Sequence, residues 1–521
     1  MSSPEPVPTT PDGTTASTNP TTEPAHRRVE AWIGRHKIAL SGCFAIGFTG
    51  GFAGPSAWDW YLRQDITPGH GTIIGGFFVV TAAAIAYTGT HLTRTSTERI
   101  AIAKNDLDTT NAERAHNLAD IQELRRRFVT TTAQFADPSP EVRLAGVYAL
   151  EALTNDWIDR DQPDDAQTCI NYLCGYLTRP YTPPTEHPHL RQTVVTPDIG
   201  THVQRTYVHP YDDLHVRHAI NRTIARHLQT DTRHDWSEYD YDFTGAHLHN
   251  ADFRNCHFRK VTIFTNVHFE GDQAWFSGTH FLGQETMFDG ARFHCSQTSF
   301  TRADFQNELT SFANARFYSE RTSFGADFDC EAIWFMEAEF HGRETKFDRA
   351  RFLGGTLVFD GAMFLSKQTS FDNVIFRSDD WTSFSDTWFN CRDALTFHGA
   401  EFHKRSDFNG TEFRGGWTSF NDAELHGKTT FTVAQFGSQL TTFQRTKFRG
   451  TYIAFWKARF FGATTSFEGA RFAGGRTSFE GPAEWKNVYF DWDPEIPYAV
   501  RATKPDSVTP NDWPPTVVQD N

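Results

Sequence analysis

Residues 298–317 read TSFTRADFQNELTSFANARF, and the repeat in this stretch decides the fold. The unit T-S-F-x-x-A-x-F occurs twice, so the phenylalanines are separated alternately by five and seven positions: Phe300, Phe305, Phe312 and Phe317. The same rhythm runs from Phe264 to Phe479, with slips of one residue. This spacing matches neither the 3.6-residue period of a helix nor the two-residue period of a flat strand.

A coiling chain explains the period. If each short segment forms one side of a four-sided turn, the phenylalanine points inward, and the Ala or Thr two residues before it also points inward and must be small. A small residue two positions after the second phenylalanine, such as Gly342 or Ser366, then stands where the backbone bends. Stacked turns place phenylalanine over phenylalanine and pair their backbones. Two units make a turn of 24 residues, and roughly ten turns at ~4.8 Å each give a rod of about 50 Å.

The composition limits the classes of function. The chain has 49 Lys+Arg against 64 Asp+Glu, a net charge of −15, which argues against nucleic-acid binding through a generally basic surface. Phenylalanine is in excess, with 48 residues against 14 Trp and 14 Tyr, which indicates packing rather than polar recognition. Seven cysteines without a CxxC motif predict neither a disulfide framework nor a zinc knuckle.

Two apolar runs precede the repeat. Ile38–Trp58 has 21 residues and Ile66–Thr93 has 28, all without Asp, Glu, Lys or Arg. Each is long enough to cross a bilayer as a helix, which takes ~20 residues. The alternative is a pair of buried soluble helices. Glycines four residues apart allow close helix contact, so a homo-oligomer is one expectation, formed through Gly47, Gly51, Gly50 and Gly54.

Charged residues beside these runs predict their orientation. Basic residues precede the first run and follow the second: Arg27, Arg28, Arg35, Lys37, Arg94, Arg99 and Lys104. The positive-inside rule then predicts a transmembrane hairpin with both chain ends in the cytoplasm.

The middle of the chain reads as helical. A long helix is predicted over 96–135, a second begins with Ser139 as cap and Pro140 in its first turn, and two more cover Ala166–Leu177 and Asp212–Gln229. The helices before residue 180 together resemble one unit of an armadillo-like array. The Pro-rich stretch 180–211 is expected to be a loop.

Histidines crowd this region, with eleven of the 23 between residues 187 and 257. His215 and His218 lie one helical turn apart and could share a metal with His227 or His247. No acidic or thiol ligand accompanies them at a characteristic spacing, so solvated histidines beside a helix are the favoured interpretation, and no metal site or cofactor is expected.

The repeat resembles the pentapeptide-repeat family, whose unit is a small residue, Asp or Asn, Leu or Phe, and two more residues. The segments 251–255 (ADFRN) and 303–307 (ADFQN) match this unit, and the resemblance covers about residues 241–490. It implies a mainly β fold, a right-handed quadrilateral β-helix. The seven-residue step departs from the family pattern by inserting two residues at alternate corners. With the apolar runs and the stretch 125–153, the chain also resembles membrane-anchored bacterial pentapeptide-repeat proteins, which implies a bacterial plasma membrane.

These observations predict five regions. They are a disordered N-terminal tail (1–30), a transmembrane hairpin (31–93), a helical stalk and collar (94–236), the β-helix (237–490) and a C-terminal tail (491–521) that is disordered from Asp493. Trp485, Tyr489, Phe490 and Trp492 are expected to cover the open end of the β-helix.

The function predicted is a membrane-tethered, non-enzymatic scaffold that presents the β-helical rod to an unidentified protein partner in the cytoplasm. No GxGxxG in a strand-to-helix context, GxxxxGK[ST], HExxH or GxSxG motif is present, so no catalytic residue is assigned. The family resemblance adds a DNA mimic directed at topoisomerases as an alternative, and the histidines add a metal-dependent hydrolase. Residues 241–490 carry 30 acidic and 26 basic residues, a net charge of −4. DNA of ~50 Å carries roughly 30 negative charges, which disfavours the mimic.

Overall fold

The computed structural model describes residues 68–181, 192–195, 205–208, 213–493 and 501–518. The chain divides into two compact units, residues 1–116 and 117–521.

The first unit is described from Pro68 onward, where helix α3 (Pro68–Gln134) begins and continues into the second unit. The helix predicted over 96–135 is confirmed, and it starts earlier, inside the second apolar run. No helix within the described ranges has an apolar stretch long enough to cross a membrane, so the predicted hairpin gains no support there. Its first run, Ile38–Trp58, and the N-terminal tail lie outside the described residues.

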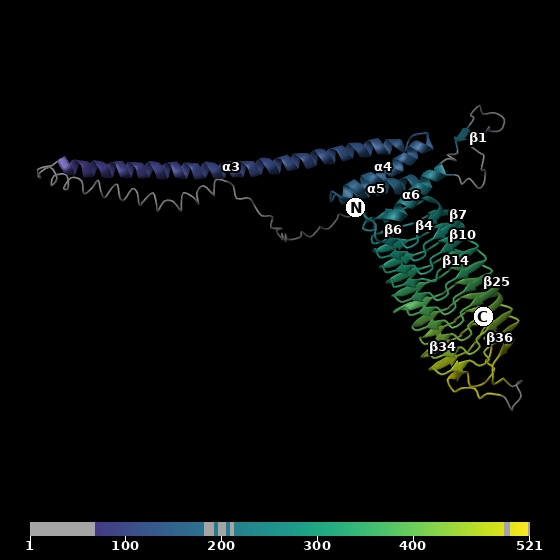
Figure 1. The fold of residues 1–521 in the computed structure, drawn as a ribbon. Helices are drawn as coiled ribbons and strands as arrows, with labels where there is room; N and C mark the ends of the chain where they lie inside the picture. The colour runs from purple at the N-terminus through teal and green to yellow at the C-terminus, as the bar shows by residue number, and fades with distance from the viewer. Residues whose placement is uncertain (1–67, 182–191, 196–204, 209–212, 494–500, 519–521) are drawn as a thin grey trace, which may run out of the picture. The chain divides into compact units, whose positions relative to one another are not determined.

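Three short helices form a collar at the start of the second unit (Figure 1): α4 (Pro140–Ile158), α5 (Pro163–Leu177) and α6 (Asp213–His227). The predicted cap of α4 is confirmed, because the Ser139 hydroxyl accepts a hydrogen bond from the Val142 amide at 3.4 Å. The helices bury apolar side chains against one another and against the end of α3, among them Phe135, Leu150, Trp157, Ile170 and Ile224.

A hairpin lies in the stretch predicted to be a loop. Strands β1 (Gln192–Val195) and β2 (Arg205–Val208) pair antiparallel, so the loop prediction is wrong for these residues. Both segments are rich in β-branched residues, which favour strands and which the prolines around them obscured.

The rest of the second unit is a parallel β-solenoid of about 10 turns. In one turn the chain passes through β10 (Arg292–Ser299), β11 (Asp304–Phe305) and β12 (Leu309–Ser311), and β13 (Arg316–Phe317) begins the next. The two ends of β10 form two sides, because residues 292–293 pair with β13 and residues 297–299 pair with β14 (Arg321–Ser323). The predicted four sides are therefore present, formed alternately by two- and three-residue pairings that match the five- and seven-residue steps.

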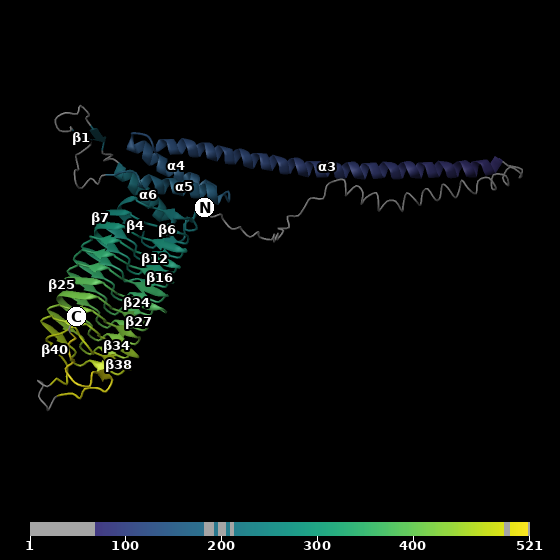
Figure 2. The same cartoon turned by 180° about the vertical axis from the view of Figure 1, so that it is seen from behind.

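The sides form long parallel sheets, seen from both directions in Figures 1 and 2. A 10-stranded sheet runs between β5 (His257–Phe258) and β37 (Arg471–Phe472), and a 12-stranded sheet runs from β3 (Tyr241–Asp242) to β41 (Val508–Thr509). Strands such as β4 (His247–Asp252) and β7 (His268–Trp275) continue around a corner and join the other two sides. Pairing Arg292 with Arg316 confirms the 24-residue turn, and the slips appear as turns of other lengths, such as Phe305 with Phe328.

Phenylalanine side chains fill the interior, as predicted. Phe312 is fully buried and stacks between Phe288 at 4.8 Å and Phe335 at 4.9 Å, with rings tilted by only 5° and 4°. Rings from adjacent sides meet edge to face, as Phe300 and Phe312 do at 85°. Both geometries are favourable for aromatic quadrupoles, so the four columns support one another.

Two positions at the corners of the coil have special requirements, one for its backbone conformation and the other for a small side chain. Residues two places after the first phenylalanine of the unit adopt a left-handed backbone, with φ of 57° at Asn314 and 65° at Gly290. The predicted corner residue after the second phenylalanine is small for another reason, because a Cβ at Gly354 would lie 1.7 Å from the carbonyl oxygen of Cys330 in the coil before. Close contact between coils, rather than an unusual φ, therefore requires glycine there.

The prediction of a disordered C-terminal tail is wrong for residues 501–518. Strand β41 extends the 12-stranded sheet by pairing with β38 (Arg476–Ser478), and Val508 is buried. The indole of Trp513 packs 4.9 Å from the ring of Phe490 and 6.0 Å from that of Phe479. The last coil has no coil beyond it, and the tail supplies the missing backbone and aromatic partners.

Candidate functional site

The structure separates the histidines that the sequence grouped together. His215 and His218 lie on α6 and border one surface groove. His227 is engaged elsewhere: its Nε2 lies 2.9 Å from Oε1 of Glu151, its Nδ1 lies 2.9 Å from the carbonyl oxygen of His234, and its ring stacks on Trp236. The grouping of His215 and His218 with His227 or His247 is therefore not assembled among the described residues.

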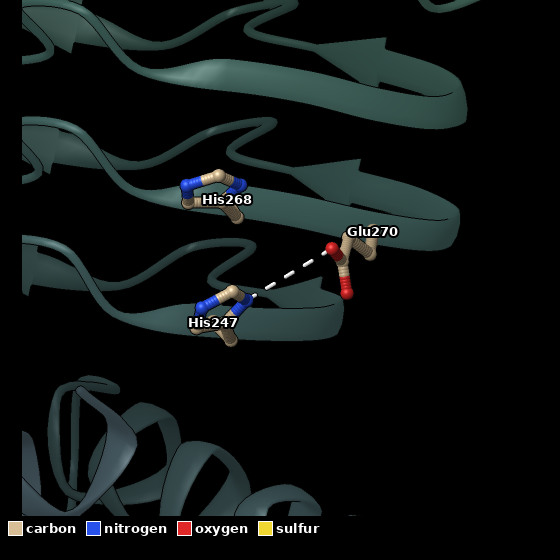
Figure 3. A group of neighbouring side chains, drawn as sticks. All are labelled: His247, His268 and Glu270. Atoms are coloured by element: carbon tan, nitrogen blue, oxygen red, sulfur yellow. Dashed lines mark ion pairs between the residues drawn. The ribbon is translucent and has the colours of Figure 1, made fainter. Parts of the chain in front are cut away.

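A different group of side chains converges on the first two coils of the solenoid (Figure 3). His247 lies on β4, and His268 and Glu270 lie on the next strand of the same side, β7. Parallel pairing places His247 in register with His268 and His249 in register with Glu270. Since Leu248 and Phe269 point into the core, the residues on either side of them point outward.

The three side chains lie close together. The rings of His247 and His268 stack with centroids 4.7 Å apart, and Nδ1 of His247 lies 3.9 Å from Oε1 of Glu270. One ligand atom from each residue falls within 4.8 Å of the other two. Sequence reasoning missed this group. The signal was the 21-residue step from Phe243 to Phe264, because the same step applied to an outward-facing position places His268 over His247.

Burial favours the neutral imidazole at His268 and at the neighbouring His249. Burial lowers the pKa of His268, and the charges of His247 and Arg292 lower it further. Burial also lowers the pKa of His249, whose Nδ1 lies 3.3 Å from Nε2 of His218. A neutral imidazole keeps one nitrogen lone pair available as a ligand.

The sides of the solenoid carry a second feature, an acidic groove lined by the carboxylates of Glu308, Asp329, Glu331, Asp379 and Asp380. No Lys or Arg lines it, and no ion pair to these five carboxylates occurs in the part of the chain that the structure describes. Elsewhere acidic side chains are neutralised by the next coil, as where Arg445 donates to Asp422 at 2.8 Å and 2.6 Å. The groove is thus a local region of negative potential on a solenoid of low net charge.

An unforeseen ion pair holds the collar together. The Arg217 guanidinium is buried and donates to Oδ2 of Asp213 at 2.7 Å and to the carbonyl oxygens of Leu177 and Arg179, each at 2.8 Å. The Asp213 carboxylate also accepts a hydrogen bond from the Tyr176 hydroxyl. Arg217 therefore caps the carbonyl end of α5. This role is structural, because every polar atom of the guanidinium has a partner within the collar.

Comparison with models of known protein families supports the interpretation of the repeat as pentapeptide repeats. Residues 243–292 match the family model described as pentapeptide repeats (9 copies). Comparison with curated proteins and with solved structures gave no match. The coils after residue 292 continue the same phenylalanine columns as those inside the matched segment. The chain therefore contains pentapeptide repeats, and these repeats begin a β-solenoid that continues through the later coils.

Proposed function

We propose that the protein is an interaction scaffold that presents the sides of its solenoid to a protein partner. The observation that carries the proposal is the filled interior: the phenylalanine columns are buried throughout, so recognition falls to the outward-facing side chains. Regular parallel coils repeat those side chains at ~4.8 Å intervals over a long surface, which suits binding of an extended partner. A pentapeptide-repeat solenoid is generally non-catalytic, and the proposal assigns no reaction.

The acidic groove indicates the chemistry of the partner. Its five carboxylates lie without basic neighbours in the lining, so they attract cationic side chains and repel anionic surfaces. We infer a protein partner that contributes Lys or Arg side chains. A DNA mimic would need far more charge than the net −4 of residues 241–490.

Attachment to a membrane forms the second part of the proposal. It rests on the apolar runs Ile38–Trp58 and Ile66–Thr93 and on their basic flanks, which favour a hairpin with cytoplasmic ends. In the described part of the second run, Val79, Val80 and Ile85 are 68%, 66% and 72% exposed, and such side chains are stabilised by burial in lipid or against another helix. Fractionation of cells expressing the full chain tests this part, because a protein released from membranes by alkaline carbonate would contradict it.

The experiment on the groove compares two sets of charge removals in the full chain. One variant neutralises Glu308, Glu331, Asp379 and Asp380 to Gln or Asn. The matched control neutralises four carboxylates that already have basic partners: Asp252, Glu412, Asp422 and Glu484.

Crosslinking in cells followed by mass spectrometry is the measurement. We expect the groove variant to lose crosslinks to a basic partner segment while the control keeps them. Equal crosslinking by the wild type and the groove variant would refute the proposed role of the groove.

A further inference from the structure

We propose that His247, His268 and Glu270 bind a divalent first-row transition metal ion, with Zn²⁺ as the representative ion. Two imidazoles and one carboxylate form a ligand set that such ions accept in proteins. The three ligands come from the first two coils, so a bound ion joins β4 to β7 at the end of the solenoid beside the collar.

The backbone already holds the ligands near the required positions. Ligand atoms that surround Zn²⁺ at ~2.0–2.2 Å lie about 3.5 Å from one another. Nδ1 of His247 and Oε1 of Glu270 are 3.9 Å apart, and all three ligand atoms lie within 4.8 Å of one another. Side-chain movements of about 1 Å bring the atoms to these separations, and the two stacked rings turn so that both in-plane lone pairs face the ion.

Two of the ligand groups lack partners of their own. Nδ1 of His247 and Oε2 of Glu270 are shielded from solvent and have no hydrogen-bond partner within the described residues. A polar atom that is buried without a hydrogen-bond partner costs free energy, and a bound ion is one of the ways in which such an atom is satisfied. Coordination of a cation satisfies the imidazole lone pair and the carboxylate together.

Other stacked histidines on the solenoid show that stacking alone does not bring three ligand atoms together. His257 and His280 stack at 4.6 Å, and Nδ1 of His280 lies 3.3 Å from Asp304, but that carboxylate also accepts a hydrogen bond from Gln306 at 2.8 Å. These side chains do not bring three ligand atoms together.

His403 and His426 stack at 5.1 Å, but each already pairs with a glutamate two residues before it at 3.0 Å. Of the stacked pairs in the described coils, the pair of His247 and His268 alone belongs to a convergent group.

Three protein ligands leave part of the coordination sphere open to water. Because the ion binds the folded coils and joins two of them, it stabilises the folded state by an amount that rises with the logarithm of its free concentration above Kd. The proposal is independent of the acidic groove, which lies on later coils.

The test is a zinc titration of the purified full chain after removal of metals with a chelator. Binding is measured by competition with a chromophoric zinc chelator, and the melting temperature is recorded with and without ZnCl₂. Two variants alter the site, His268→Ala and the nearly isosteric Glu270→Gln. His280→Ala is the matched control, because it removes one ring of the comparable stack on a neighbouring side.

We expect one zinc ion per chain and a higher melting temperature with zinc in the wild type and in His280→Ala. We expect Glu270→Gln and His268→Ala to bind at least tenfold more weakly and to lose the shift. Folding of each variant is checked by circular dichroism, and if His268→Ala fails to fold, Glu270→Gln decides. No stoichiometric binding by the wild type, unchanged affinity in Glu270→Gln, or equal weakening in His280→Ala would overturn the proposal.

Discussion

Replacing Phe312 by alanine tests whether the aromatic columns hold the coils together. The ring is fully buried, stacks on Phe288 and Phe335, and meets Phe300 and Phe324 edge to face at 5.4 Å and 5.3 Å. Truncating a buried Phe to Ala costs about 3–5 kcal/mol, and lost aromatic pairs add ~0.5–1.5 kcal/mol each, although not additively. We therefore expect a loss of about 4 kcal/mol in the coils that contain or contact residue 312.

Hydrogen exchange with mass spectrometry measures this loss locally. At about 1.4 kcal/mol per tenfold change, a loss of ~4 kcal/mol accelerates exchange roughly a thousandfold in peptides from 285–340. Coils near 431–479 should change little, since a solenoid is stabilised by contacts between neighbours.

Phe312→Leu is the matched control, because Leu425 already occupies a column between Phe402 and Phe448 and is fully buried. We expect it to cost about 1 kcal/mol. Exchange within threefold of wild type in Phe312→Ala, or equal damage from the leucine and alanine variants, would refute the role of the columns.

Four further predictions follow from other contacts. Gly354→Ala should destabilise the solenoid by about 2 kcal/mol or more in urea unfolding, because its Cβ would meet a carbonyl oxygen of the previous coil. Val433 is 47% exposed with φ of 60°, so Val433→Asn should raise stability by about 1 kcal/mol, and a lower melting temperature would contradict this. Burial raises the pKa of Cys391 to about 12, and all six described cysteines are buried, so they should resist a thiol reagent until the protein is denatured. Burial opposes ionisation of Glu151, but two basic side chains of α6 outweigh the effect of burial and lower the pKa of this carboxyl group. The stabilising contribution of Glu151 is therefore present above about pH 4.5 and is lost as the pH falls through the lowered pKa. Glu151→Gln should flatten this acid limb in pH-dependent melting curves.

The interior could be predicted from the sequence because one residue type marks it. A phenylalanine every five and seven positions fixes both the coiling and the inward face, and the structure confirms the columns from Phe264 to Phe479. The slips did not obscure the pattern, because the corners absorb them, as in the shifted register between Cys391 and Ala394. The inward-facing residues of a repeat can be predicted from the sequence because each coil has the same steric limits as the coil before it.

The candidate site could not be predicted in the same way, because it depends on the length of a single coil. His247 and His268 are 21 residues apart rather than 24, so the general period does not bring them together. The sequence also placed His247 with the histidines of α6, since proximity along the chain suggested a shared site. The ordered tail was missed for a related reason: its proline content indicates disorder, and the need of the last coil for a partner is visible only once the coils are stacked.

Segments outside the coils cover one side of the solenoid at each of its ends. At the first coil, the amides of His257 and Arg259 donate to the carbonyl oxygens of Leu228 and Ser237 at 2.8 Å and 3.0 Å, so residues after α6 occupy the open edge. At the last coil, the amide of Thr477 donates to the carbonyl oxygen of Ser507 at 2.8 Å, and the tail fills the same role. Exposed parallel edges would recruit other chains by backbone pairing, regardless of side-chain chemistry. Because backbone pairing is blocked on the covered side of each end, we expect the proposed partner to be selected by side chains on the sides of the solenoid, where the acidic groove and the histidine group lie.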